Sequence, residues 1–169
     1  MPEQTPARTR TVSWSDPMQS AQAAHGMSGL EFMQAIAAGE LPPPPIFSLM
    51  GGEISEVGEG RVVFALEPAE YHYNPIGTVH GGVISTICDS AMACAVQTRL
   101  PAGTLCTTLE LKINFLRPLT IASGRVVCTG TVIHLGSRVA TAECRLVDEA
   151  GKFYAHGTTT CMVLSEARP

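Results

Sequence analysis

The run from Gly82 to about Arg99 constrains the fold of this chain more than any other segment. Its apolar residues recur at the i, i+3, i+4 and i+7 spacing of one helical face, and Pro101 then ends the pattern. Up to Thr98 its only charged residue is Asp89, and a few small polar groups are the other interruptions. A helix that is apolar on nearly every side is buried on most sides. The remainder of the chain must therefore be able to wrap around it.

The segments around this helix alternate between apolar and polar residues with a period of two, which predicts half-buried strands. A first hairpin with a Glu59-Gly60 turn precedes the helix, and four more strands follow it, at 105–115, 125–134, 139–147 and 153–164. Short connections at 135–138 and 148–151 make the last three an antiparallel meander. The predicted fold is α+β, with a curved antiparallel sheet wrapped around one long central helix.

The N-terminal part of the chain divides at residue 28. Residues 1–27 mix Pro, Ser, Gln, Thr and Ala without periodicity, which predicts a flexible arm whose removal leaves stability and turnover within a few-fold. Ser28 and Glu31 form a capping-box signature, which predicts a short lead-in helix that ends before the prolines at 42–45. Residues 28–169 are expected to form a single domain, since their number suits one hydrophobic core.

A candidate active site lies where the central helix begins. The pair Gly81-Gly82 leaves backbone N–H groups bare at the positive end of the helix dipole, an arrangement suited to holding an oxyanion. Asp89 lies about two turns further on, too deep to cap the helix. Burial raises the basicity of a carboxylate, so Asp89 is a candidate general base or nucleophile. The alternative is a structural Asp bonded to a loop.

The spacing of Asn74, His80-Gly81-Gly82 and Asp89, together with the stretch 107–118, resembles the hotdog-fold acyl-CoA thioesterases of the phenylacetate-degradation type. The resemblance covers roughly residues 47–164. It implies a hotdog fold and the hydrolysis of an acyl-CoA, with an aryl-acetyl or medium-chain acyl group, to free acid and CoA. It also implies a dimer in which the Asp of one subunit faces the His-Gly loop of its neighbour.

The resemblance assigns roles to the residues of the motif. Gly81 would donate its N–H to the oxyanion and Gly82 would allow close helix packing. His80 would orient the loop or the thioester carbonyl, and Asn74 would hold the attacking water. Thr108 corresponds to a small hydroxyl residue near the site in related thioesterases. For most of them a structural alternative stays open: a His that is hydrogen-bonded behind the reacting groups for His80, an Asn-Pro turn for Asn74, and an exposed strand Thr for Thr108.

The phosphates of CoA require basic groups near the mouth of the site. Arg117, at the end of its strand, and Arg138, in a hairpin connection, are the candidates, and a solvated surface charge is the alternative for each. The other histidines show no metal-ligand spacing with one another or with carboxylates. The sequence therefore predicts neither a metal nor a cofactor.

The composition of the chain indicates which kinds of partner it is suited to bind. Charged residues make up only 15% of the chain and hydrophobic residues 45%, which suggests surface buried between subunits in a dimer or a tetramer of dimers. The net charge of −4 and the lack of a Lys/Arg run argue against nucleic acid. The apolar window 83–96 is too short to span a membrane, and no signal-peptide pattern is present, so a cytoplasmic protein is expected. The six cysteines include no C-x-x-C pair and are interpreted as reduced core residues.

Two rival functions remain. A hotdog protein that binds acyl-CoA without turnover is disfavoured because it would not need Asn74, His80 and Asp89 together. A hotdog dehydratase or hydratase would pair a His with a carboxylate in a different motif.

Overall fold

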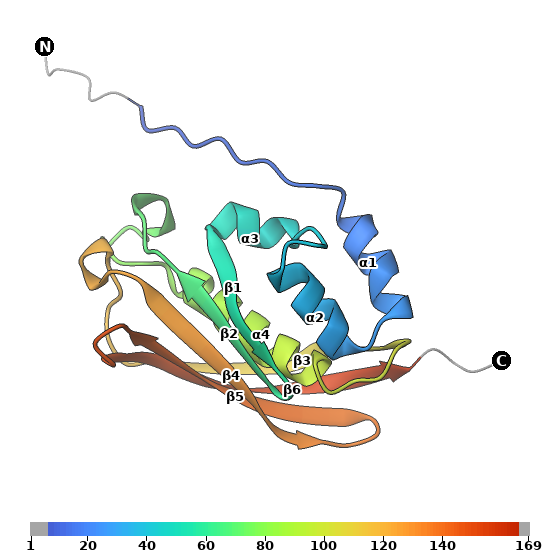
Figure 1. Cartoon of the computed structure of the whole chain (residues 1–169). Helices are drawn as coiled ribbons and strands as arrows, with labels where there is room; N and C mark the ends of the chain where they lie inside the picture. The colour runs from blue at the N-terminus through green and yellow to red at the C-terminus, as the bar shows by residue number, and fades with distance from the viewer. Residues whose placement is uncertain (1–6, 166–169) are drawn as a thin grey trace, which may run out of the picture.

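A computed structural model describes residues 7–165, and within them a curved sheet wraps around the helix α4 (Gly81–Gln97) (Figure 1). The sheet is antiparallel and has the strand order β1-β2-β4-β5-β6-β3. This is the predicted hotdog fold. The strands are β1 (Gly52–Gly58), β2 (Arg61–Leu66), β3 (Thr104–Phe115), β4 (Val126–Leu135), β5 (Val139–Asp148) and β6 (Phe153–Ser165).

Helix α4 is buried along one face, which packs into the concave side of the sheet. The close approach depends on Gly130 of β4, because a Cβ there would lie 2.1 Å from the carbonyl oxygen of Ala91. The opposite face of α4 is only half-buried and carries Thr86, Asp89 and Ser90. The helix is therefore less enclosed within one chain than its sequence predicts.

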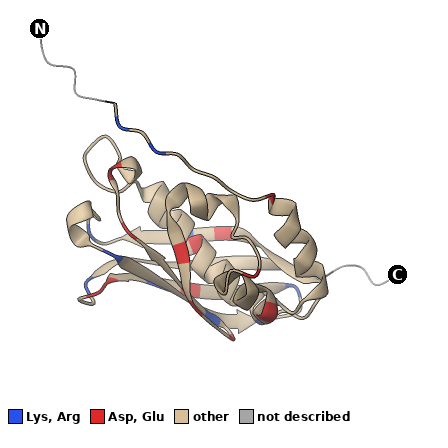
Figure 2. Ribbon diagram, turned by 45° about the horizontal axis from the view of Figure 1, so that its top comes forward, with Lys and Arg blue, Asp and Glu red and all other residues tan. Residues whose placement is uncertain are grey.

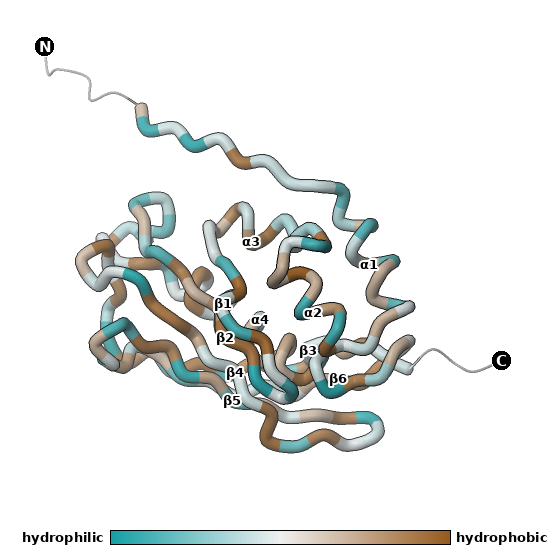
Figure 3. Tube along the Cα trace, viewed as in Figure 1, coloured by the Kyte–Doolittle hydropathy of each residue, from teal (hydrophilic) through white to brown (hydrophobic). Residues whose placement is uncertain are grey.

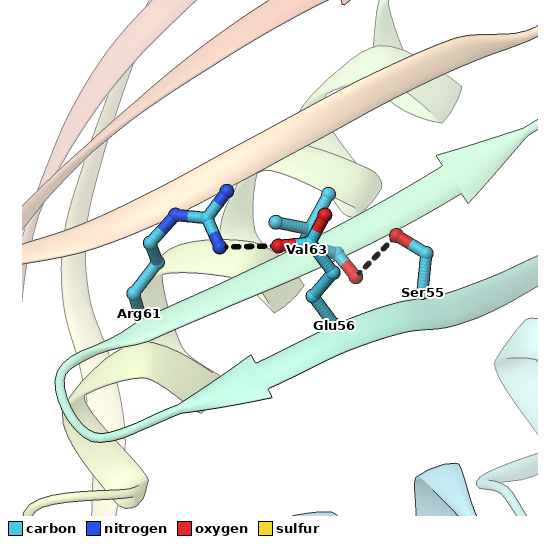
Figure 4. Close-up of polar contacts among 4 residues, drawn as sticks. All are labelled: Ser55, Glu56, Arg61 and Val63. Carbon is cyan, nitrogen blue, oxygen red and sulfur yellow. Dashed lines mark hydrogen bonds and ion pairs between the residues drawn. The ribbon is translucent and has the colours of Figure 1, made fainter.

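The β1–β2 hairpin contains a β-bulge and two contacts made by side chains (Figure 4). Ser55 is an extra residue in β1, because Ile54 pairs with Phe64 while Glu56 pairs with Val63. The Ser55 hydroxyl donates to the carbonyl oxygen of Val63 (3.3 Å), and Arg61 forms an exposed ion pair with Glu56. In β2 the residues of both faces are buried, so the expected alternation of buried and exposed residues is absent.

Three short helices precede the sheet: α1 (Pro17–Gly26), α2 (Gly29–Ala37) and α3 (Pro45–Met50). The predicted capping box of α2 is confirmed, since Ser28 and Glu31 exchange both bonds. Figure 3 shows hydrophobic positions (brown) in α2 and α3, which lie close to β1. Two further short turns of 3-10 helix, η1 (Glu70–His72) and η2 (Ile121–Ser123), flank the candidate site.

Helix α1 lies inside the region for which the sequence predicts no packed structure. Asp16 caps its first turn by accepting a hydrogen bond from the Met18 N–H (2.9 Å), and Pro17 occupies the position that proline favours. The Ser20 hydroxyl donates to the Pro42 carbonyl (2.7 Å), and Ala24 is buried. The expectation of a wholly unstructured arm is thus wrong for residues 17–26. Residues 1–6 of that arm lie outside the described residues.

Within residues 7–165 no helix is both long and apolar enough to cross a membrane.

Candidate active site

The loop before α4 is closed on itself by short-range hydrogen bonds. The His80 N–H donates to the carbonyl oxygen of His72 (2.8 Å), so the two ends of the loop meet. Inside it, the Asn74 side-chain oxygen accepts from the backbone N–H of Thr78 (3.1 Å), and its amide donates to the Thr78 hydroxyl (2.9 Å). Asn74 therefore shapes its own turn, and one of its amide hydrogens has no partner among residues 7–165.

The first turn of α4 has one free donor. His80 is the N-cap, and its Nδ1 accepts the Gly82 N–H (2.8 Å), while Val83 and Ile84 donate to the His80 carbonyl oxygen. The Gly81 N–H makes no hydrogen bond within the described chain. A negatively charged oxygen would find there an unsatisfied donor at the positive end of a helix dipole.

Position 82 requires a glycine for a different reason from the one that the sequence indicates. The sequence assigns it to close helix packing, but Gly82 is exposed and a Cβ there would lie 2.9 Å from Nδ1 of His80. A glycine is needed because the His80 ring occupies that space as it caps the helix. Gly81 is the closely packed residue, since its Cβ would lie 3.3 Å from the Phe115 ring.

Asp89 is held by a neighbouring strand. The Thr108 hydroxyl of β3 donates to Asp89 Oδ1 (2.8 Å), while Oδ2 has no partner among residues 7–165. Both side chains are half-buried. The register of β3 shifts between Thr108 and Glu110, which leaves Leu109 as an extra residue beside the pair. One carboxylate oxygen is thus fixed, and the other is available for chemistry.

A cleft of about 350 Å³ brings together several of the residues singled out by sequence. Its lining includes Asn74, Gly81, Phe115 and Arg117, but not Asp89. Asp89 follows Gly81 by eight residues of α4, which corresponds to about 12 Å along the helix axis. The Gly81 N–H and the Asp89 carboxylate of one chain are therefore too far apart to act on one carbonyl.

The two arginines predicted to bind phosphate lie at different places. Arg117 lines the cleft, and its guanidinium donates to the Phe153 carbonyl. Arg138 lies beside the far end of β6, where the Val163 N–H donates to its carbonyl oxygen. Their contacts on β6, at Phe153 and Val163, are ten residues apart, or roughly 33 Å along the strand.

His72 is a structural centre of the site that the sequence analysis missed. Its Nδ1 accepts the Ala69 N–H (3.0 Å), and Nε2 lies 2.7 Å from the Met50 carbonyl oxygen, to which it can donate as a neutral imidazole. The ring is 3% exposed, and burial lowers its pKa. His72 thereby ties the end of α3 to the loop that presents Gly81. No spacing in the sequence marks it, because its partners are backbone atoms.

Three cysteines far apart in sequence form the one group in residues 7–165 whose ligand atoms could surround a metal ion. The sulfur atoms of Cys88, Cys128 and Cys144 lie within 4.8 Å of one another in the core under α4. Hydrogen bonds among these thiols, together with burial, raise the pKa of Cys128 well above its usual range, whereas hydrogen bonds with the same neighbours lower the pKa of Cys144. The cluster lies apart from the Gly81 cleft.

The chain is similar in sequence to known proteins. The family model described as the thioesterase superfamily matches residues 76–155, which carry Gly81, Asp89 and Thr108. Human acyl-coenzyme A thioesterase 13 is 31% identical over 104 residues, which are 60% of this chain and 71% of the relative. The chain belongs to the thioesterase superfamily. As a member it is a thioester hydrolase.

Two further relatives of this thioesterase agree. A 1,4-dihydroxy-2-naphthoyl-CoA hydrolase from Listeria monocytogenes is 28% identical over 114 residues, covering 68% of this chain and 91% of the relative. A phenylacetic acid degradation-related protein from Ralstonia eutropha has a solved structure that matches with a TM-score of 0.69 and 30% identity, covering 76% of this chain and 97% of that one. The resemblance to the phenylacetate-degradation type is thereby confirmed.

Proposed function

We propose that this thioesterase hydrolyses acyl-CoA to a free acid and CoA at a site built from two subunits. The substrate class is supported by the relatives, whose names specify coenzyme A thioesters. An aryl-acetyl or medium-chain acyl group is the proposed substrate, in keeping with the phenylacetic acid named for one relative. A cytoplasmic location remains part of the proposal.

The separation of Gly81 from Asp89 is the observation that carries the two-subunit site. A thioester carbonyl would have to lie about 3 Å from the oxyanion donor and near the base at once. The distance of about 12 Å along α4 forbids this within one chain. In a symmetric dimer, Asp89 of one subunit can face Gly81 of its partner, and each site is then complete.

The β3 edge of the sheet is the proposed dimer surface. Within the described chain β3 pairs only with β6, so its other edge is open. Leu109, Phe115 and Leu116 lie on or just after this strand and are 56%, 52% and 45% exposed. An open strand edge with exposed apolar side chains is suited to pairing with a second copy. Either a dimer or a tetramer of such dimers satisfies this requirement.

The proposed site supplies a hydrogen-bond donor, Gly81, a base or nucleophile, Asp89, and a hydroxyl that positions it, Thr108. The Gly81 N–H donates a hydrogen bond to the carbonyl oxygen and stabilises the negative charge that develops there as the C=O bond becomes single. Asp89 uses its free Oδ2 either to take the proton from an attacking water or to attack the carbonyl carbon itself, with water then cleaving the resulting anhydride. In the first route the C–S bond breaks as the tetrahedral intermediate collapses, and the leaving thiolate takes the proton that Asp89 removed from water. In the second the C–S bond breaks as the anhydride forms, and the water that cleaves the anhydride supplies the proton for the thiolate and releases the acid. Thr108 fixes the carboxylate throughout.

The remaining motif residues have supporting parts. His80 holds the first turn so that the Gly81 donor stays free, and Gly82 leaves room for that ring. Asn74 has one amide hydrogen left with which to hold a water in the cleft. Arg117 is placed to meet CoA at the cleft, and Arg138, more distant in its own subunit, is a candidate contact only for a site shared with a partner.

The test is the release of free thiol from a panel of acyl-CoAs by the wild-type protein and by Asp89→Asn. We expect turnover by the wild type and a loss of about 10²-fold or more in kcat in the variant, because a general base contributes that much. Circular dichroism should show both folded. Release of no thiol from any acyl-CoA would favour a binding protein, and water addition to an enoyl-CoA would favour a hydratase. A variant that keeps more than about a tenth of kcat would remove Asp89 from the chemistry.

A further inference from the structure

A cavity of about 660 Å³ lies on the other side of the active-site loop, and the proposed chemistry does not use it. One wall is the extended segment before α1, with Arg8 and Arg10, and the other carries Tyr71, Tyr73 and Ile121. Figure 2 shows basic residues (blue) on this extended segment, which Figure 1 shows passing back over α3. The acidic Glu70 also lines the cavity, which therefore combines two arginines, one glutamate and aromatic rings.

The extended segment is held in place by its arginines. The Arg10 guanidinium donates to the carbonyl oxygens of Leu49 and Ser48 at the end of α3, and it lies 4.0 Å from the centre of the Tyr71 ring. Arg8 pairs with Glu70, and both side chains are largely exposed. Arg10 therefore fixes the wall, while the exposed Arg8 pair contributes little and can exchange its partner.

This cavity and the Gly81 cleft share a wall. Tyr73 lines the cavity and the next residue, Asn74, lines the cleft; likewise Ile121 lines the cavity and Leu119 the cleft. The Ile121 N–H donates to the Tyr73 hydroxyl (2.9 Å), which closes the wall between them. A ligand whose reacting end lies in the cleft can extend over this wall.

The cleft alone is too small for the proposed substrate. Its volume of about 350 Å³ is near the lower end for pockets that hold small organic ligands, and acyl-CoA is a much larger molecule. The nucleotide end of CoA must lie outside it. That end carries a purine and phosphates, for which tyrosine rings and arginine side chains are the suited contacts.

We propose that the cavity between the extended segment and η1 binds the phosphorylated adenosine of CoA, with Arg8 and Arg10 contacting phosphate and Tyr71 and Tyr73 bordering the base. The inference rests on the proposed acyl-CoA substrate. It gives the N-terminal segment, which lies outside the residues matched by the family model, a part in substrate binding.

The test compares one acyl group carried on CoA and on pantetheine, which lacks the nucleotide. In Arg8→Gln/Arg10→Gln we expect the KM for acyl-CoA to rise roughly tenfold or more, because charged hydrogen bonds are lost, while the KM for acyl-pantetheine changes less than about twofold. The difference should shrink as ionic strength rises. Arg8→Gln alone, which leaves the α3 contacts intact, should raise the KM for acyl-CoA in the same direction.

Arg61→Gln is the matched control, because Arg61 is also an exposed arginine paired with a glutamate but lies on the β1–β2 hairpin. It should leave both KM values unchanged. An unchanged KM for acyl-CoA in the double variant, or an equal rise for both substrates, would overturn the proposal. If no thioester is cleaved, the proposed function fails, and calorimetry with adenosine 3′,5′-bisphosphate then decides this inference. Binding that weakens in the double variant supports it, and absent or unaltered binding refutes it.

Discussion

At the scale of single residues, the contact between Thr108 and Asp89 is the best-defined feature of the proposed chemistry. The hydroxyl fixes Oδ1 at 2.8 Å and leaves Oδ2 open. We predict that Thr108→Val lowers kcat roughly tenfold, since a hydrogen bond to a charged group is lost, while Thr108→Ser stays close to the wild type. Steady-state thiol release measures both. Equal activity of the Val and Ser variants would assign Thr108 to the strand alone.

His72 gives a prediction about pH. Burial lowers its folded pKa below the unfolded value of about 6.5, and the nearby Arg10 charge acts in the same direction. The unfolded chain therefore binds the proton more readily, so the stability that neutral His72 contributes is present above about pH 6.5 and is lost as the pH falls. Urea unfolding from about pH 7.5 to 5.5 should show this fall in the wild type and a smaller fall in His72→Gln. The exposed His134 is the control: His134→Gln should keep the wild-type slope.

At the scale of elements, the packing of α4 on β4 depends on one glycine. Gly130→Ala would place a Cβ 2.1 Å from the Ala91 carbonyl oxygen, and both are backbone-anchored, so helix and strand must separate. We predict a destabilisation of about 3 kcal/mol or more in urea unfolding. Gly26→Ala, at the end of α1 with nothing within 4 Å, should stay within about 0.5 kcal/mol of the wild type. A small effect at Gly130 would mean that α4 lies further from the sheet.

The elements also show how far the sequence could lead. The period of α4 and the alternation of β3 to β6 are set by contact with one core, so the hotdog fold and its meander were predictable. Helices α1 and α3 were not, because they are short and lack a full apolar period; only Asp16-Pro17 and Pro45 mark their starts. In the proposed site, Gly81 and Asp89 were singled out by their place in the central helix and their spacing, and Thr108 by the family resemblance. His72 and the cysteine cluster depend on contacts between distant segments, which one sequence does not reveal.

At the scale of the whole molecule, the N-terminal region is more than a disposable arm. Helix α1 and the Arg10 contacts attach it to α3 and to the η1 loop. These contacts argue against the expectation that removal of residues 1–27 leaves stability and turnover within a few-fold of the full chain. The two proposals thus extend beyond the segment that carries Gly81 and Asp89: the N-terminal region is proposed to bind CoA, and the open β3 edge to form the dimer.

The central claim is that each active site takes Gly81 from one subunit and Asp89 from the other, and complementation tests it most directly. Gly81→Pro removes the N–H at a helix position that proline favours, and Gly81→Ala, which keeps the N–H, is its matched control. Gly81→Pro and Asp89→Asn homodimers should both be inactive. Heterodimers of the two, isolated with different tags, should regain about half of wild-type activity, since one of their two sites has both groups intact. Heterodimers as inactive as their parents would contradict the shared site.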